Sequence, residues 1–175
     1  MGPTEQPNTD QNQNNVDQDK DNFENLSNQE FSSEFFDTVK WFSIGAKKGD
    51  AGALEWLVRK ATQGNPNAQY ELGMLYKDGV DSTKDANDAM ELFSKAAEQG
   101  HIEAQYELGK LYIFREGCSR NTVKGVELIK DSADRGCTGA QIFLGNMYRD
   151  GYLVPKDKEK SEEYFKKAEE GSALE

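Results

Sequence analysis

The sequence predicts an all-α fold: a right-handed α–α superhelix (a solenoid) of helix-turn-helix repeats, preceded by an irregular N-terminal helix. Three observations predict it. A six-residue motif occurs three times at intervals of 36 residues, and the apolar residues around each copy follow helical spacing. Glycines and helix-capping residues recur at the same interval. Independent features that share one period indicate a repeat architecture.

Residues 1–28 form an acidic segment rich in Asn, Gln and Asp. Residues 1–34 hold eight acidic side chains and one lysine, so they carry −7 of the formal net charge of −11. With few apolar side chains to bury, such a segment cannot offset the entropy cost of ordering, and we expect a disordered tail. It acts as a linker or as a segment that folds on a partner, and composition leaves both open.

Residues 29–65 are predicted to form a capping helix and a second helix that together make an irregular hairpin. The capping helix lacks the repeated motif but has an apolar stripe at helical spacing, formed by Phe31, Phe35, Val39, Phe42 and Ala46. The second helix contains Trp56. A solenoid needs such a cap, because an uncapped repeat exposes an apolar face.

The first helix of each repeat is predicted from the recurring motif. Residues 68–73 and 104–109 both read Ala-Gln-Tyr-Glu-Leu-Gly, and residues 140–145 read Ala-Gln-Ile-Phe-Leu-Gly. The apolar residues of the first copy fall at i, i+4, i+7 and i+8: Ala68, Leu72, Leu75 and Tyr76. Each motif ends on a glycine inside the helix, which costs about 1 kcal/mol relative to alanine. A cost repeated three times predicts that a neighbouring helix backbone approaches Gly73, Gly109 and Gly145 closely.

The second helix of each repeat has its own start and stop signals. Good N-cap residues stand 36 residues apart at Asp85, Asn121 and Asp157. Glycines suited to a left-handed C-cap recur at the same interval. Gly64 closes the helix that contains Trp56, and Gly100 and Gly136 close the second helices of the first two repeats. Residues 66–175 are therefore predicted to hold three repeats, at about 66–100, 101–136 and 137–172.

The motifs together resemble the Sel-one-like repeat (SLR) family, a branch of the tetratricopeptide-like α-solenoids. The resemblance rests on Ala-x-x-x-Leu-Gly-x-x-Tyr, a glycine loop, Asp-x-x-Lys-Ala and Lys-Ala-Ala-x-x-Gly. It implies an α-solenoid fold. Two departures are informative: Leu153 stands where the second loop glycine belongs, and Glu169 replaces an alanine, so we expect its face to meet solvent.

The sequence shows no catalytic, cofactor-binding or metal-binding residues, and we predict that the protein is not an enzyme. His101 is the single histidine, and we expect it to be solvated in an inter-repeat turn. Some cysteine-rich relatives in the resembled family are linked to β-lactam hydrolysis, which leaves a β-lactam-hydrolysing enzyme as an alternative. It is disfavoured because no serine has a lysine three residues later.

Cys118 and Cys137 are predicted not to form a disulfide. One precedes and the other follows a helix of about 14 residues, which separates them by roughly 20 Å at 1.5 Å per residue. A disulfide needs Cα atoms within about 7 Å. Two unpaired thiols favour a reducing compartment.

A partner is expected to dock on the inner, concave face, which the first helices line. On each first helix, three positions at i, i+4 and i+7 are not needed for packing within the hairpin. They are Tyr70, Met74, Lys77, Tyr106, Lys110, Ile113, Ile142, Asn146 and Arg149. This mixture of aromatic, apolar and cationic side chains suits a partly acidic peptide. The alternative is that Tyr70, Tyr106 and Ile142 pack between repeats.

The function predicted from these residues is a non-catalytic adaptor or scaffold for a protein or peptide partner. A bacterial factor that is exported and engages a host protein is the alternative within the binding class. The repeats carry no basic stripe for nucleic acid and no apolar run long enough to span a membrane, and we expect a monomer. No signal peptide is apparent, which leaves cytoplasm and export both open.

Overall fold

The computed structural model describes residues 33–80, 86–114 and 121–172, with side chains from Thr38 onward. The chain divides into two compact units, Met1–Asp37 and Thr38–Glu175, and the second holds the features discussed below. The tail predicted to be disordered, residues 1–28, lies outside the described residues.

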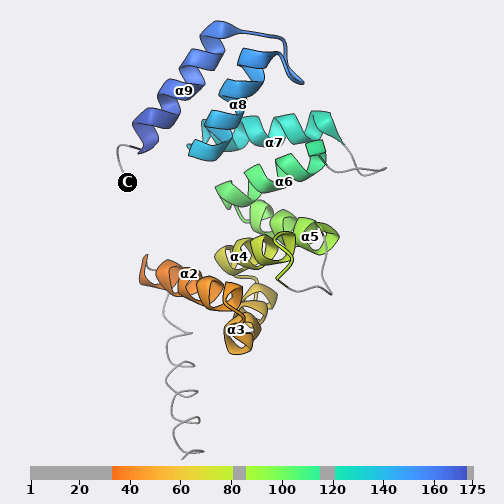
Figure 1. The fold of residues 1–175 in the computed structure, drawn as a ribbon, viewed down its shortest axis with the longest axis vertical. Helices are drawn as coiled ribbons and strands as arrows, with labels where there is room; N and C mark the ends of the chain where they lie inside the picture. Colours follow the sequence, from red (N-terminus) through yellow and green to blue (C-terminus); the bar gives the residue numbers. More distant parts are fainter. Residues whose placement is uncertain (1–32, 81–85, 115–120, 173–175) are drawn as a thin grey trace, which may run out of the picture. The chain divides into compact units, whose positions relative to one another are not determined.

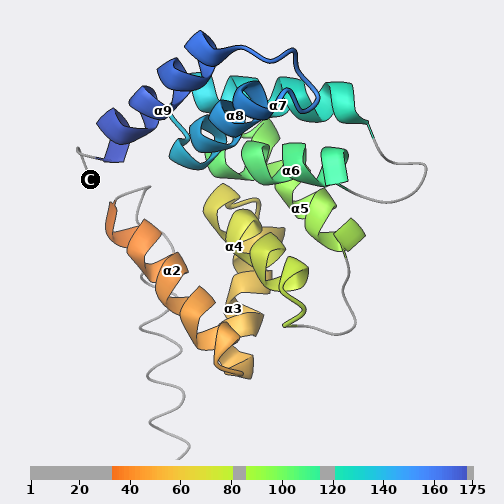
Figure 2. The same ribbon diagram turned by 45° about the horizontal axis from the view of Figure 1, so that its top comes forward.

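Within these ranges the secondary structure is entirely helical (Figure 1). The helices are α2 (Ser33–Lys47), α3 (Ala51–Thr62), α4 (Pro66–Lys77), α5 (Ala86–Glu98), α6 (Ile102–Phe114), α7 (Thr122–Asp134), α8 (Thr138–Asp150) and α9 (Lys158–Ser172). Helices α4 and α5, α6 and α7, and α8 and α9 pack as hairpins, and each hairpin contacts the next through consecutive helices (Figure 2). The predicted α-solenoid is confirmed.

The aromatic stripe before the repeats packs as predicted where it is described. Val39, Phe42 and Ala46 are buried on α2. The Phe42 ring stacks on that of Trp56 in α3, with centroids 4.1 Å apart. Phe31 and the side chain of Phe35 lie outside the described residues.

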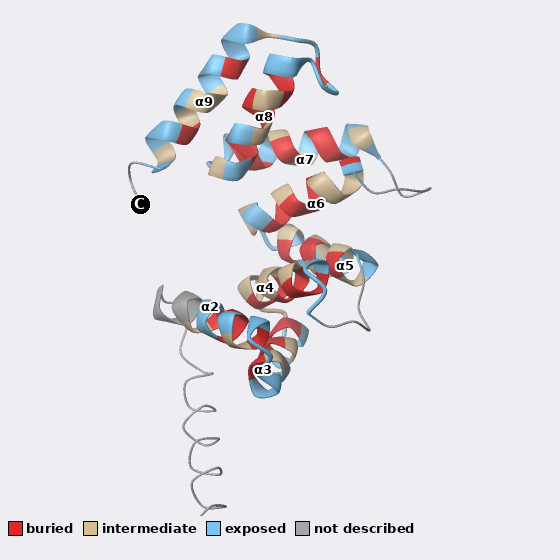
Figure 3. Ribbon diagram, viewed as in Figure 1, coloured by how far each residue is buried: buried red, intermediate tan, exposed pale blue. Residues whose placement is uncertain are grey.

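Buried residues concentrate where the helices meet (Figure 3). The core of the second and third hairpins includes Ile113, Ile129 and Leu144, each fully buried. Helix α9 buries only Ser161 and Ala168 and exposes Glu169, as expected for that charge.

The glycines inside the first helices mark close helix contacts, but in two hairpins the neighbour is a side chain. A Cβ added to Gly73 would lie 2.8 Å from Cε1 of Phe93, and one added to Gly145 would lie 2.7 Å from Cε1 of Phe165. Only at Gly109 is the neighbour also backbone, the carbonyl oxygen of Gly125 at 2.9 Å. The predicted backbone approach therefore holds only for the middle hairpin.

The predicted helix ends are present in the described residues. Gly64, Gly100 and Gly136 have φ of 91°, 89° and 100°, in the left-handed region. Asn121 Oδ1 accepts the Lys124 N–H at 3.0 Å, and Asp157 Oδ1 accepts the Lys160 N–H at 3.1 Å. Asp85 lies outside the described residues.

The motif glutamines connect neighbouring helices. Their side chains are buried, and Nε2 of Gln69 donates to the Ala61 carbonyl at 3.1 Å, as Gln141 does to Ala133 at 3.0 Å. Gln105 departs from this pattern, because its amide donates to Asp131 instead.

The glutamine carbonyl is satisfied in two hairpins and not in the third. Oε1 of Gln69 accepts from Gln99 at 2.8 Å, and Oε1 of Gln105 accepts from Arg135 at 2.8 Å. The next position in this 36-residue series is Gly171, which has no side chain. Within the described part of the chain, the buried Oε1 of Gln141 has no donor.

We expect Gly171→Gln to stabilise the protein, because it extends this pattern to the third hairpin. A Cβ at Gly171 meets only Thr138 Oγ1, at 3.5 Å, so a side chain fits. The hydrogen bond should add about 1 kcal/mol to the free energy of unfolding, and loss of a helical glycine up to about 1 kcal/mol more. Gly171→Ala removes the helical glycine without adding the hydrogen bond, so it measures the helix-propensity contribution alone. Urea denaturation in which the glutamine variant is no more stable than the alanine variant would contradict the expectation.

Leu153 adopts the conformation of the glycine that it replaces. Its φ is 59°, and it is the only non-glycine residue with positive φ among the described residues. A leucine in the left-handed region is strained by about 1–2 kcal/mol, and its side chain is exposed. We therefore expect Leu153→Gly to raise the melting temperature. Tyr152→Gly, at the exposed neighbouring position, should lower it, and equal effects of the two changes would rule out relief of strain.

Candidate partner-binding surface

The first helices α4, α6 and α8 present a common face, here called the first-helix face. It comprises the nine predicted positions apart from Ile113. Lys77, Ile142 and Arg149 are exposed, whereas Met74, Lys110 and Asn146 are half-buried. The structure therefore leaves polar, cationic and apolar side chains accessible along these helices.

Ile113 does not belong to this surface. Its side chain is 0% exposed and lies in the core, so the prediction that it contacts a partner is wrong. The reason is Gly125 in α7: a Cβ there would lie 2.6 Å from Cγ1 of Ile113. The missing side chain of Gly125 gives Ile113 room to pack inward.

The two tyrosines of the face are half-buried and pack between helices. Tyr70 stacks on His101, with ring centroids 4.6 Å apart, and burial raises its pKa. Tyr106 contacts Phe143, and Lys110 Nζ lies 4.5 Å from its ring centroid. Burial, with a smaller effect of Glu107, raises the pKa of Tyr106 to about 12. Each tyrosine thus packs against a neighbouring helix and leaves only part of its ring on the first-helix face.

Glu107 forms ion pairs with two lysines of the first-helix face. Its side chain is only 9% exposed, and its carboxylate lies 2.8 Å from Lys77 Nζ and 2.6 Å from Lys110 Nζ. Two ammonium groups share one carboxylate, so the cluster keeps a net positive charge. The spacing of Glu107 and Lys110 on one helix is visible in the sequence, but the contact with Lys77 depends on how α4 and α6 pack.

In the third hairpin, an aromatic residue takes the place of the motif glutamate. Position 143 in the motif is phenylalanine, whereas the first two copies have Glu71 and Glu107. Phe143 contacts Phe114 edge to face, with centroids 5.9 Å apart, and Phe114 is 55% exposed. Phe114 therefore packs on its neighbour and still leaves apolar surface exposed.

His101 is not the solvated turn residue that the sequence predicts. Its side chain is 7% exposed, and Nδ1 accepts the Ala104 N–H at 3.2 Å, which caps α6. Asn65, 36 residues earlier, caps α4 in the same way. Burial lowers the pKa of His101, and the nearby Glu103 carboxylate partly opposes this shift.

The lowered pKa of His101 predicts a stability that falls in mild acid. The folded state favours neutral imidazole, so the unfolded chain binds a proton first as the pH drops below the ordinary value of about 6.5. The contribution is fully present above that pH and is lost as the pH falls through the folded pKa. His101→Asn retains the cap and removes the titration. Melting temperatures measured from pH 8 to 5 should therefore fall more steeply for wild type than for the variant, and parallel curves would contradict this.

Among the described residues there is no group of three or more His, Cys, Asp or Glu placed to hold a metal ion. Cys137 is a buried free thiol, and Cys118 lies outside the described residues. No helix in the described ranges combines the length and apolarity needed to cross a membrane.

Comparisons with known proteins agree with the repeat geometry. The family model described as Sel1 repeat matches residues 66–101, 102–137 and 138–172. A search of curated proteins finds no match.

Several solved structures share the fold, and two of them are described here. One is c5321, described as a protective antigen present in uropathogenic Escherichia coli strains and displaying an SLR fold, at 42% identity and a TM-score of 0.60. The match covers 67% of this chain and 25% of that one, so this chain spans about a quarter of c5321. The other is a Sel1 repeat protein from Oxalobacter formigenes, at 30% identity and a TM-score of 0.60, covering 69% of this chain and 90% of that one. The chain belongs to the Sel1 repeat family.

Proposed function

We propose that the protein is a non-catalytic adaptor that binds a protein or peptide through the first-helix face, the concave face of the solenoid. Proteins with Sel1 repeats are generally protein–protein interaction scaffolds. The observation that carries the proposal for this chain is that each of the three first helices leaves a side chain accessible: Lys77 on α4, the half-buried Lys110 on α6, and Ile142 and Arg149 on α8.

The chemistry of the face favours a partner segment that combines acidic and apolar side chains. The Lys77–Glu107–Lys110 cluster has one more positive than negative charge. A carboxylate from a partner would therefore meet an ammonium group that is already held in place, which reduces the entropy lost on binding. Ile142, 45% exposed, provides an apolar contact on the neighbouring first helix.

The test uses peptides selected from a phage-displayed library on the wild-type protein. Lys77→Gln with Arg149→Gln should weaken the selected peptides at least tenfold and reduce the salt dependence of binding. The control is Lys158→Gln with Lys166→Gln, which removes the same charge from the exposed side of α9. Equal affinities of the two double variants would place binding elsewhere. Turnover of a chromogenic β-lactam by the purified protein would contradict the non-catalytic part of the proposal.

A second candidate is an exported bacterial factor whose first-helix face engages a host protein. The observation that favours it is the 42% identity to c5321, a protective antigen of uropathogenic Escherichia coli. Immunodetection in culture medium, relative to a cytosolic marker, tests export. A protein found only with the cytosolic marker would exclude this candidate and leave the adaptor proposal intact.

A further inference from the structure

Helix α6 differs from α4 and α8 at two positions one helical turn apart, Lys110 and Phe114. The residues 36 positions before and after Lys110 are uncharged, and those before and after Phe114 are acidic: Met74, Asn146, Asp78 and Asp150. Among the three first helices, only the middle one therefore has a lysine followed one turn later by an exposed aromatic ring.

The aspartates at the counterpart positions are used within the protein, whereas Phe114 keeps an open surface. Asp78 lies 3.7 Å from a lysine ammonium of α2, and Asp150 accepts from Nε of Arg149 at 2.9 Å. The Phe114 ring packs edge to face on Phe143 and is still 55% exposed. Covering such a ring with an apolar side chain is favourable, and aromatic residues often dominate the energy of an interface.

The two phenylalanines adjoin the first-helix face. Phe143 contacts Tyr106 as well as Phe114, with ring centroids 6.1 Å and 5.9 Å away. Tyr106 belongs to the face and lies under the Lys110 ammonium. An apolar side chain that covers the Phe114–Phe143 pair is therefore next to the cations of the face.

Lys110 supplies the charged part of this site. Its ammonium lies 2.6 Å from the Glu107 carboxylate, which also pairs with Lys77, so the cluster has one positive charge in excess. The side chains of both lysines are 28% exposed and can be reached by a partner. A carboxylate complements this charge.

The spacing of the two features fixes the spacing in the partner. Lys110 and Phe114 are four residues apart, which is about 6 Å along a helix. In an extended chain, side chains two positions apart point to the same side and lie about 6.6 Å apart. We propose that the partner is an extended segment in which one residue separates an acidic side chain, bound at Lys110, from an aromatic or branched aliphatic side chain, bound at the Phe114–Phe143 pair. This inference rests on the proposed function and names its partner class.

The experiment uses nine-residue peptides displayed on phage, which are too short to form a stable helix. Selection on the wild-type protein should enrich this acidic and apolar spacing at least fivefold over the unselected library. Selected peptides that require Lys77 and Arg149 but lack the spacing would overturn the inference and leave the adaptor function intact. If no selected peptide loses affinity in the Lys77→Gln, Arg149→Gln variant, both the proposed function and this inference fail.

Double-mutant cycles between protein and peptide test the register. Replacing the apolar peptide residue by alanine should weaken binding at least tenfold to the wild type and less than twofold to Phe114→Ala. Replacing the acidic residue by its amide should show the same coupling with Lys110→Met, which introduces the residue found at Met74. Tyr152→Ala removes an exposed ring from the loop after α8 and should leave both effects unchanged. Circular dichroism checks that each variant folds, and additive effects in both cycles would refute the proposal.

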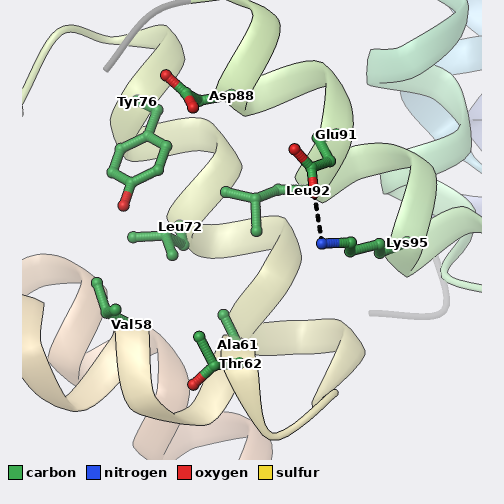
Figure 4. A pocket seen from close by; sticks show the side chains of 9 residues that line it. All are labelled: Val58, Ala61, Thr62, Leu72, Tyr76, Asp88, Glu91, Leu92 and Lys95. Atoms are coloured by element: carbon green, nitrogen blue, oxygen red, sulfur yellow. Dashed lines mark hydrogen bonds and ion pairs between the residues drawn. The ribbon is translucent and has the colours of Figure 1, made fainter. Parts of the chain in front are cut away.

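Methyl signals locate the apolar residue of a selected peptide that carries phenylalanine at that position. Its ring should shift the methyl signals of Ile142, which is 45% exposed and precedes Phe143 on α8. The competing apolar site is a cavity of about 180 Å³ between α3, α4 and α5, lined by Val58, Leu72 and Leu92 (Figure 4). Shifts at these three residues instead of Ile142 would overturn the assignment to α6 and α8.

Discussion

Phe93→Ala is expected to lower the free energy of unfolding by about 3–5 kcal/mol, the usual cost of truncating a buried phenylalanine. Phe93 is 0% exposed and is the largest fully buried side chain in the described residues. Its ring fills the space that Gly73 leaves on α4, and it also contacts the Tyr70 ring, at a centroid distance of 6.0 Å. Removing the ring therefore separates the two helices of one hairpin and withdraws support from the first-helix face.

A double-mutant cycle makes the prediction specific. Gly73→Ala alone brings a Cβ to 2.8 Å from Cε1 of Phe93 and should destabilise the wild type. In the Phe93→Ala background the clash is gone, and the same change should be neutral or stabilising. We expect a coupling of about 1–3 kcal/mol in urea denaturation, within the range found for contacting residues. Additive effects would contradict the contact, and Phe114→Ala, at an exposed ring, is the control for loss of an aromatic.

Gly109→Ala is expected to destabilise the protein by about 3 kcal/mol, at the upper end for an overpacked site. The added Cβ would lie 2.7 Å from Cγ1 of Ile129 and 2.9 Å from the Gly125 carbonyl oxygen. A side chain at that distance can rotate away, but the carbonyl oxygen moves only if α7 shifts as a whole. The clash therefore outweighs the gain of about 1 kcal/mol that alanine brings to a helix.

Urea denaturation measures this effect, and Gly171→Ala is the matched control. Both changes add one methyl group to a helical glycine, but the nearest atom at Gly171 is 3.5 Å away. The control should be neutral or stabilising. A loss of less than about 1 kcal/mol at Gly109, or the gain that helix propensity alone would give, would show that α6 and α7 tolerate a wider separation.

The fold could be predicted from the sequence because its determinants are local and repeated. Helical spacing, capping residues and terminal glycines each act within about ten residues, and the period of 36 multiplies their signal. The same reasoning placed Val39, Phe42 and Ala46 on the buried face of α2, although that helix lacks the motif.

The candidate surface was less predictable because burial depends on neighbouring helices. Ile113 occupies the position of Lys77 and Arg149, and only Gly125, twelve residues later, allows it to pack inward. Some missed features did leave a sequence signal. His101 stands 36 residues after the capping residue Asn65, which indicates a cap rather than a solvated turn. The Lys77–Glu107 contact left no signal in the sequence, because it joins side chains 30 residues apart on different helices.

Chemical-shift mapping of a library-selected peptide on the ¹⁵N-labelled protein tests the proposed binding function most directly. Binding on the first-helix face predicts that the largest amide shifts fall on α4, α6 and α8, around Lys77, Lys110 and Arg149. They should be lost in the Lys77→Gln, Arg149→Gln variant and kept in the Lys158→Gln, Lys166→Gln control. Shifts confined to α5, α7 and α9 would contradict the proposed binding face.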